Sequence, residues 1–149
     1  MVLSIKLEKI INNRSVIRVL LVDDSADWRS ALLAKLRADP GLQVVGYAAD
    51  GVEAVLRAKE LQPDLILLDI GLPRLNGIGA AREIRKSATE SKIVFLSQET
   101  DPDIVRAAIG AGGQGYVVKS DAEGDLFAAV RAVMLGKKFV SRSLADHEV

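Results

Sequence analysis

The sequence contains 149 residues, 49% of them hydrophobic, which is enough for one domain with a sizeable core. Lys and Arg together number 20 and Asp and Glu number 20, so no net charge favours binding to nucleic acid or to a membrane surface. The absence of cysteine excludes disulfides and thiolate metal sites and agrees with a cytoplasmic location, and no apolar stretch reaches the ~20 residues of a membrane span.

Short aliphatic segments alternate with amphipathic segments from residue 16 onward, after an expected N-terminal extension at residues 1–15. Strands are predicted at residues 16–22, 42–48, 65–68, 92–97 and 115–119. The helices between and after them are predicted to begin at Asp24 or Ser25, Asp50, Asn76, Asp101 and Ala122. Residues 137–149 have mixed polarity and no evident core to join, so we expect a domain at residues 16–136 followed by a tail or the start of a linker.

Five strands alternating with five helices predict a doubly wound α/β domain with right-handed crossovers. We expect the flavodoxin-like (βα)5 arrangement, with a five-stranded parallel sheet in the order 2-1-3-4-5. The segment Leu65–Leu68 is an unbroken aliphatic run without polar alternation. That pattern is typical of a central parallel strand covered by helices on both faces.

Carboxylates follow two of these strands at the edge where open α/β sheets bind their ligands. Asp23 and Asp24 follow the first strand, and Asp69 follows the third. Neighbouring strands lie ~4.8 Å apart, and two like charges ~4 Å apart repel by about 4 kcal/mol at an effective dielectric of 20. Such a cluster must take up protons or hold a cation, and hard oxygen ligands of this kind suit Mg²⁺.

Two further polar residues end strands at the same predicted edge. Ser97 ends the fourth strand and Lys119 ends the fifth. Each residue alone has an ordinary structural explanation, as a helix cap, a turn residue or a solvated lysine. Their joint placement is the signal, because a carboxylate nucleophile, a divalent cation, a lysine and a hydroxyl together provide what phosphoryl transfer needs.

These residues stand in segments that resemble the receiver domain of bacterial two-component response regulators. The resemblance covers about residues 16–135 and is carried by LLVDD ending at Asp24, LLDIGLP around Asp69, FLS ending at Ser97 and GYVVK ending at Lys119. The family resemblance implies a switch that catalyses its own phosphorylation and dephosphorylation rather than a conventional turnover enzyme. We therefore expect a signalling protein of the cytoplasm.

The resemblance also implies a role for each site residue. Asp69 would accept a phosphoryl group from a histidine kinase or a histidine phosphotransferase. Asp23, Asp24, a carboxylate oxygen of Asp69 and the backbone carbonyl of Gly71 would hold Mg²⁺. Ser97 would hydrogen-bond the phosphoryl group and Lys119 would pair with it.

The family's switch aromatic falls on Tyr116. It would rotate from an exposed to a buried position when Ser97 and Lys119 are drawn toward a phosphoryl group. The surface formed by the fourth helix, fifth strand and fifth helix often mediates dimerisation in this family, which predicts a possible homodimer. The glycine-rich segment at residues 110–116 and Ser120 after Lys119 resemble the subfamily of transcription regulators with a LuxR-type helix-turn-helix. DNA would then be contacted only by an output domain, and no membrane contact is expected.

One departure and three alternatives complete these expectations. Gln98 stands where the family usually has a small residue, so its side chain could restrict access of the phosphodonor. A haloacid-dehalogenase-like phosphatase would need a second aspartate at position 71, which is glycine. The acidic loop after the first strand argues against flavin binding. A receiver-like interaction scaffold that is never phosphorylated stays open as the alternative function.

The single tryptophan, Trp28, shares a helical stripe with Leu32 and Leu36. Core packing is therefore its favoured role. Because Trp28 lies in the first turn after Asp24, we also expect its ring near the acidic pair, with an exposed part that could contact a docking kinase or phosphotransferase.

Overall fold

The computed structural model describes residues 16–147, and the extension predicted at residues 1–15 lies outside this range. One sheet of six parallel strands has the order β2-β1-β3-β4-β5-β6. The strands are β1 (Ile17–Val22), β2 (Leu42–Ala48), β3 (Leu65–Leu68), β4 (Lys92–Ser97), β5 (Gly115–Val118) and β6 (Phe139–Val140). The α-helices are α2 (Ala26–Arg37), α3 (Gly51–Leu61), α4 (Gly77–Ser87), α5 (Pro102–Gly110) and α6 (Ala122–Met134), with 3-10 helices η1 (Lys119–Asp121) and η2 (Arg142–His147).

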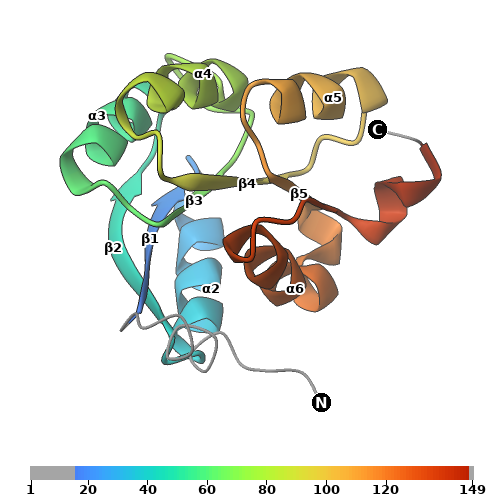
Figure 1. The fold of residues 1–149 in the computed structure, drawn as a ribbon, viewed down its shortest axis with the longest axis horizontal. Coiled ribbons are helices and arrows are strands. Elements are labelled where there is room, and N and C mark those ends of the chain that lie inside the picture. The colour runs from blue at the N-terminus through green and yellow to red at the C-terminus, as the bar shows by residue number, and fades with distance from the viewer. Residues whose placement is uncertain (1–15, 148–149) are drawn as a thin grey trace.

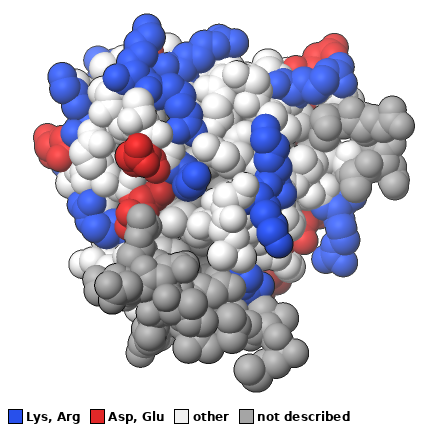
Figure 2. Space-filling model, in the orientation of Figure 1, with Lys and Arg blue, Asp and Glu red and all other residues white. Residues whose placement is uncertain are grey.

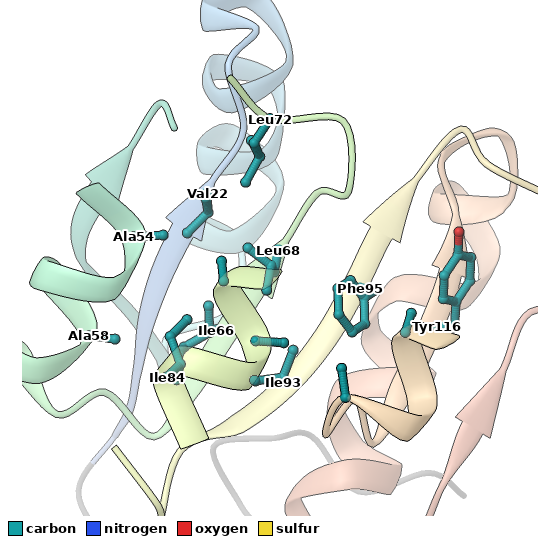
Figure 3. Packing of buried hydrophobic residues seen from close by; sticks show 14 of the residues in the cluster. Val22, Ala54, Ala58, Ile66, Leu68, Leu72, Ile84, Ile93, Phe95 and Tyr116 are labelled. Atoms are coloured by element: carbon teal, nitrogen blue, oxygen red, sulfur yellow. The ribbon is translucent and has the colours of Figure 1, made fainter. Parts of the chain in front are cut away.

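Helices cover both faces of the sheet. Helices α3, α4 and α5 lie on one face, and α2 and α6 lie on the other (Figure 1). Each face has its own apolar cluster. On the first face, Ile66, Ile84 and Phe95 lie among the side chains between the sheet and its helices (Figure 3). This arrangement confirms the predicted doubly wound, flavodoxin-like α/β fold.

Side-chain caps fix where most of the helices begin. The caps Ser25, Asp50, Asn76 and Asp101 each accept a hydrogen bond from a backbone N–H of the first helical turn. The sequence left Asp24 or Ser25 open for the first helix, and the structure identifies Ser25, whose Oγ accepts from Trp28 N at 3.2 Å. These caps leave the preceding strand ends free to present side chains at the carboxyl edge.

The expectation of five strands is wrong in one respect, because β6 adds a sixth strand beside β5. The expectation that residues 137–149 have no core to join is also wrong, since Leu144 is buried in the cluster that contains Tyr116. The two residues of β6 gain burial and hydrogen bonds only beside β5, so their own sequence carries too short a pattern to reveal a strand. The suggestion that this segment starts a linker stays a prediction.

Charge on the molecular surface is mixed. Lys and Arg side chains gather above α4 in the view of Figure 2, and some are paired, as in the 2.9 Å contact between Lys86 and Glu83.

Among the described residues, no helix combines the length and apolar character needed to cross a membrane.

Candidate functional site

Three carboxylates converge at the carboxyl edge of the two central strands. Val22 of β1 pairs with Leu68 of β3, so Asp23 and Asp69 follow directly paired residues. Carboxylate oxygens of Asp23, Asp24 and Asp69 lie within 4.8 Å of one another. Asp23 and Asp69 are buried, whereas Asp24 is exposed. The cluster is therefore anchored in the core and open to solvent on one side.

The loop after Asp69 is held close to the start of α4. The backbone N–H of Ile70 donates to Asp69 Oδ1 at 2.7 Å, and the N–H of Gly77 donates to the carbonyl of Ile70 at 2.8 Å. A Cβ atom at Gly77 would lie 1.9 Å from the carbonyl oxygen of Asp69. Only glycine permits this approach, so the orientation of Asp69 depends on a residue outside the cluster.

The ammonium of Lys119 lies between two of the carboxylates. Lys119 Nζ is 2.7 Å from Asp23 Oδ2 and 3.3 Å from Asp69 Oδ2. Its other close neighbour is the ring of Trp28, with 4.9 Å from Nζ to the ring centroid. Lys119 opens η1 rather than ending the strand as predicted, and its side chain reaches the carboxylates of Asp23 and Asp69.

An open pocket of about 370 Å³ lies over the cluster. Besides the three aspartates and Lys119, its lining includes Gly71, Ser97, Gln98 and Glu99. Ser97 is buried, and its Oγ accepts from the backbone N–H of Glu99 at 3.2 Å. Gln98 is exposed at the rim. The structure thus brings together every residue predicted for the phosphoryl and metal sites.

Tyr116 lies behind this pocket, beneath the loop that carries Glu99. Its ring is fully buried and stacks on Phe95 with 6.1 Å between centroids, and its hydroxyl donates to the carbonyl of Glu99 at 2.7 Å. Burial raises the pKa of the phenol to about 12. The expectation of an exposed starting position is wrong for this structure, because stacking and the hydroxyl's hydrogen bond already hold the ring inside (Figure 3).

The donor set fits a hard divalent cation. Three carboxylates face the ammonium of Lys119, and negative charge remains in excess even with the Arg29 guanidinium at the backbone carbonyl of Asp23. Carboxylate oxygens and an open side for water are what Mg²⁺ prefers over a closed protein cage. The same arrangement leaves Asp69 accessible from the pocket as a nucleophile.

Two features of the site were missed by sequence reasoning. The first is the contact of Lys119 with Trp28, although Trp28 was expected near the acidic pair. The second is Glu99, which lines the pocket and accepts the hydrogen bond from Tyr116. The position of Glu99 two residues after Ser97 was an available signal. The meeting of Trp28 with Lys119 depends on side-chain geometry between separate elements, which the sequence pattern does not contain.

Comparison with known sequences supports one family. The sequence model described as "Response regulator receiver domain" matches residues 19–131. The transcriptional regulatory protein LiaR of Bacillus subtilis is 37% identical over 130 residues, which are 87% of this chain and 62% of LiaR. The response regulator GacA of Pseudomonas viridiflava is 36% identical over 132 residues, which are 88% of this chain and 61% of GacA. The chain therefore spans about three-fifths of the length of these relatives.

Solved structures agree with the sequence comparison. A two-component response regulator of the LuxR family from Aurantimonas sp. SI85-9A1 superposes with a TM-score of 0.84 at 32% identity, covering 89% of this chain and 94% of that one. The response regulator domain of Thermotoga maritima CheB gives a TM-score of 0.67 at 38% identity, covering 81% of this chain and 92% of that one.

Proposed function

This chain belongs to the family of response regulator receiver domains, and on that premise we propose that Asp69 accepts a phosphoryl group from a phosphohistidine. An Asp69 oxygen attacks phosphorus, the bond from phosphorus to the donor nitrogen breaks, and an aspartyl phosphate forms. The donor is a histidine kinase or a histidine phosphotransferase of the cytoplasm. The convergence of three carboxylates and Lys119 at an open pocket is the observation that carries this proposal.

The neighbours of Asp69 supply positioning and charge neutralisation, which dominate catalysis of phosphoryl transfer. Lys119 pairs with an oxygen of the incoming group, because it is already 3.3 Å from Asp69 Oδ2. The hydroxyl of Ser97 lines the same pocket and hydrogen-bonds the phosphoryl group. Gln98 at the rim limits the approach of bulky donors.

Mg²⁺ is the cofactor that the donor set fits. Asp23, Asp24, Asp69 and the backbone carbonyl of Gly71 would hold it, since all four residues line the pocket. When bound, the ion neutralises charge that develops on the phosphoryl oxygens. In its absence the excess negative charge of the cluster opposes an anionic donor.

Phosphorylation is read out through β5 and the loop after β4. Tyr116 couples them, because its hydroxyl bonds Glu99 in the loop while its backbone pairs within the sheet. Dimerisation through the face made by α5, β5 and α6 stays our prediction. On that face β6 already pairs with β5, so a partner would meet the segment that contains β6.

The relatives suggest where such a signal leads. LiaR carries the name of a transcriptional regulatory protein, and the Aurantimonas protein is a regulator of the LuxR family. We infer that this receiver controls an output of the same class. Any contact with DNA would come from an output domain and not from the residues of this domain.

A small phosphodonor tests the proposal without knowledge of the kinase. Acetyl phosphate with Mg²⁺ should add the mass of one phosphoryl group to the intact protein, and Asp69→Asn or a chelator should prevent it. Asp27→Asn is a matched control, because Asp27 is an exposed acid in the first turn of α2 outside the cluster. Full incorporation by Asp69→Asn would refute the assigned nucleophile. No incorporation by the unaltered protein would favour the unphosphorylated scaffold.

A further inference from the structure

The ammonium of Lys119 has anchors of two different kinds. Two are anionic, the carboxylates of Asp23 and Asp69 at 2.7 and 3.3 Å. The third is the uncharged face of the Trp28 indole, whose centroid lies 4.9 Å from Nζ. This distance is within the range in which an aromatic face attracts a cation.

A series of contacts that begins and ends at Asp23 fixes the indole relative to the acidic cluster. Asp23 Oδ1 accepts from the N–H of Ser25 at 2.9 Å, and Ser25 Oγ accepts from the N–H of Trp28 at 3.2 Å. The Trp28 ring then meets Lys119, whose ammonium returns to Asp23 Oδ2. The helix cap that starts α2 therefore also sets the place of the ring beside the lysine.

The surroundings of Trp28 show on which side of Lys119 the ring lies. Lys119 lines the pocket over the carboxylates and also a second depression of about 440 Å³ between α2 and the start of α6. Trp28 lines only the second. The ring thus contacts Lys119 from the side opposite to Asp69. Its buried indole N–H has no hydrogen-bond partner among the described residues, so contacts of the ring itself hold it there.

We propose that Trp28 is a positioning residue for phosphoryl transfer, holding the Lys119 ammonium over Asp69 through the face of its indole. The inference rests on the proposed function. A divalent cation on the cluster competes with Lys119 for Asp23 and Asp69, whereas it does not compete for the ring. Trp28 is therefore the anchor that remains when the carboxylates are shared, and it keeps the lysine from turning toward solvent.

A graded substitution series distinguishes this role from simple packing. Trp28→Leu should lower the rate of phosphorylation by acetyl phosphate about threefold to tenfold, because an aliphatic side chain fills space without attracting a cation. Trp28→Phe should retain most of the rate, since a smaller aromatic face still attracts the ammonium. Equal rates in Leu and Phe variants would overturn the proposal, as would a Leu variant with the unaltered rate.

A double-mutant cycle shows whether Trp28 acts through Lys119. In a Lys119→Met background, Trp28→Leu should leave the residual rate unchanged, because there is no ammonium left to position. An undiminished effect of Trp28→Leu in that background would mean that Trp28 acts by another route. Phe127→Leu is the matched control, because the Phe127 ring makes the same kind of contact with Lys35, with 5.6 Å from Nζ to the ring centroid, and neither residue lines the pocket over the carboxylates. Its phosphorylation rate should equal that of the unaltered protein.

A spectroscopic measurement keeps the inference separate from the proposed function. Trp28 is the single tryptophan of the chain, so its emission reports on the ring alone. Lys119→Met should change that emission without donor or metal present, while Lys86→Met should not, because Lys86 lies in α4 on the opposite face of the sheet from Trp28. Identical emission in the Lys119→Met and unaltered proteins would overturn the contact. If the emission changes but the unaltered protein takes up no phosphoryl group, the proposed function fails and the contact stands.

Discussion

Two regions of this molecule bury carboxylates, and they do so in opposite ways. At the carboxyl edge of the sheet, Asp23 and Asp69 face each other and Asp24 across an open pocket and share one ammonium. Beside β6, Asp125 stands apart from that cluster, and its carboxylate is surrounded by donors. Asp23, Asp69 and Asp125 are all buried, so burial alone does not separate a site from a structural contact.

The donors around Asp125 explain its structural character. Asp125 Oδ2 accepts from the hydroxyl of Ser141 at 3.2 Å and from the backbone N–H of Arg142 at 3.3 Å. The guanidinium of Arg142 lies 3.5 Å from Oδ1. Ser141 Oγ in turn accepts from the N–H of Val118 at 3.0 Å, which ties the C-terminal segment to β5. A carboxylate whose oxygens accept hydrogen bonds from such donors stabilises the fold. Converging carboxylates instead repel one another unless a cation or a proton binds.

The largest expected difference concerns stability. Asp125→Ala should lower the free energy of unfolding by about 2–3 kcal/mol, because the buried hydroxyl of Ser141 and the N–H of Arg142 lose their acceptor. Asp69→Asn should change it by no more than about 1 kcal/mol, since the loss of contact with Lys119 is offset by relief of repulsion among like charges.

Urea unfolding of both variants measures this difference. Asp125→Asn is the conservative control, and it should lie between Asp125→Ala and the unaltered protein because its amide oxygen can still accept. Equal destabilisation by Asp125→Ala and Asp69→Asn would erase the distinction between the two regions.

The second prediction concerns the response to Mg²⁺. Saturable binding to the acidic cluster should raise the free energy of unfolding by about 1.4 kcal/mol at ten times the dissociation constant. Asp24→Ala should remove most of this gain, because Asp24 is the exposed carboxylate of the cluster. Asp125→Asn should keep the full gain in a thermal unfolding titration. A gain that survives in Asp24→Ala would place the cation elsewhere.

The smallest expected effect concerns Tyr116, which lies between the two regions. Its pKa is raised to about 12 by burial, whereas an unfolded tyrosine titrates near pH 10. Between these values the folded protein retains a proton that the unfolded chain has released, so the free energy of unfolding falls as pH rises. The loss should reach about 1 kcal/mol by about pH 11.

Tyr116→Phe isolates this contribution, because it lacks the phenolic proton. The difference in free energy of unfolding between the unaltered protein and Tyr116→Phe should shrink between about pH 9 and about pH 11.5. A constant difference across this range would mean that the phenol is not shielded from water as the structure shows.

The two regions also differ in how far sequence could predict them. Asp23 and Asp69 each follow an aliphatic strand and Ser97 ends one, so local patterns and the rules of parallel sheets were enough to bring them together. The two residues of β6 form a strand too short for a periodic pattern. The role of Asp125 depends on its hydrogen bond with Ser141, which lies 16 residues further along the chain. Likewise, the buried position of Tyr116 depends on Phe95 and on the carbonyl of Glu99. Such long-range contacts do not appear in local sequence.

Chemical trapping of the phosphorylated residue tests the central claim most directly. Borohydride reduces an aspartyl phosphate to the alcohol, so treatment of the protein after acetyl phosphate and Mg²⁺ should convert Asp69 to homoserine. Peptide mapping should find homoserine at position 69 and unmodified aspartate at positions 23 and 24. Homoserine at position 23 or 24 would contradict the assignment of Asp69 as the acceptor. So would a protein that has gained the mass of a phosphoryl group but still contains aspartate at position 69 after borohydride treatment.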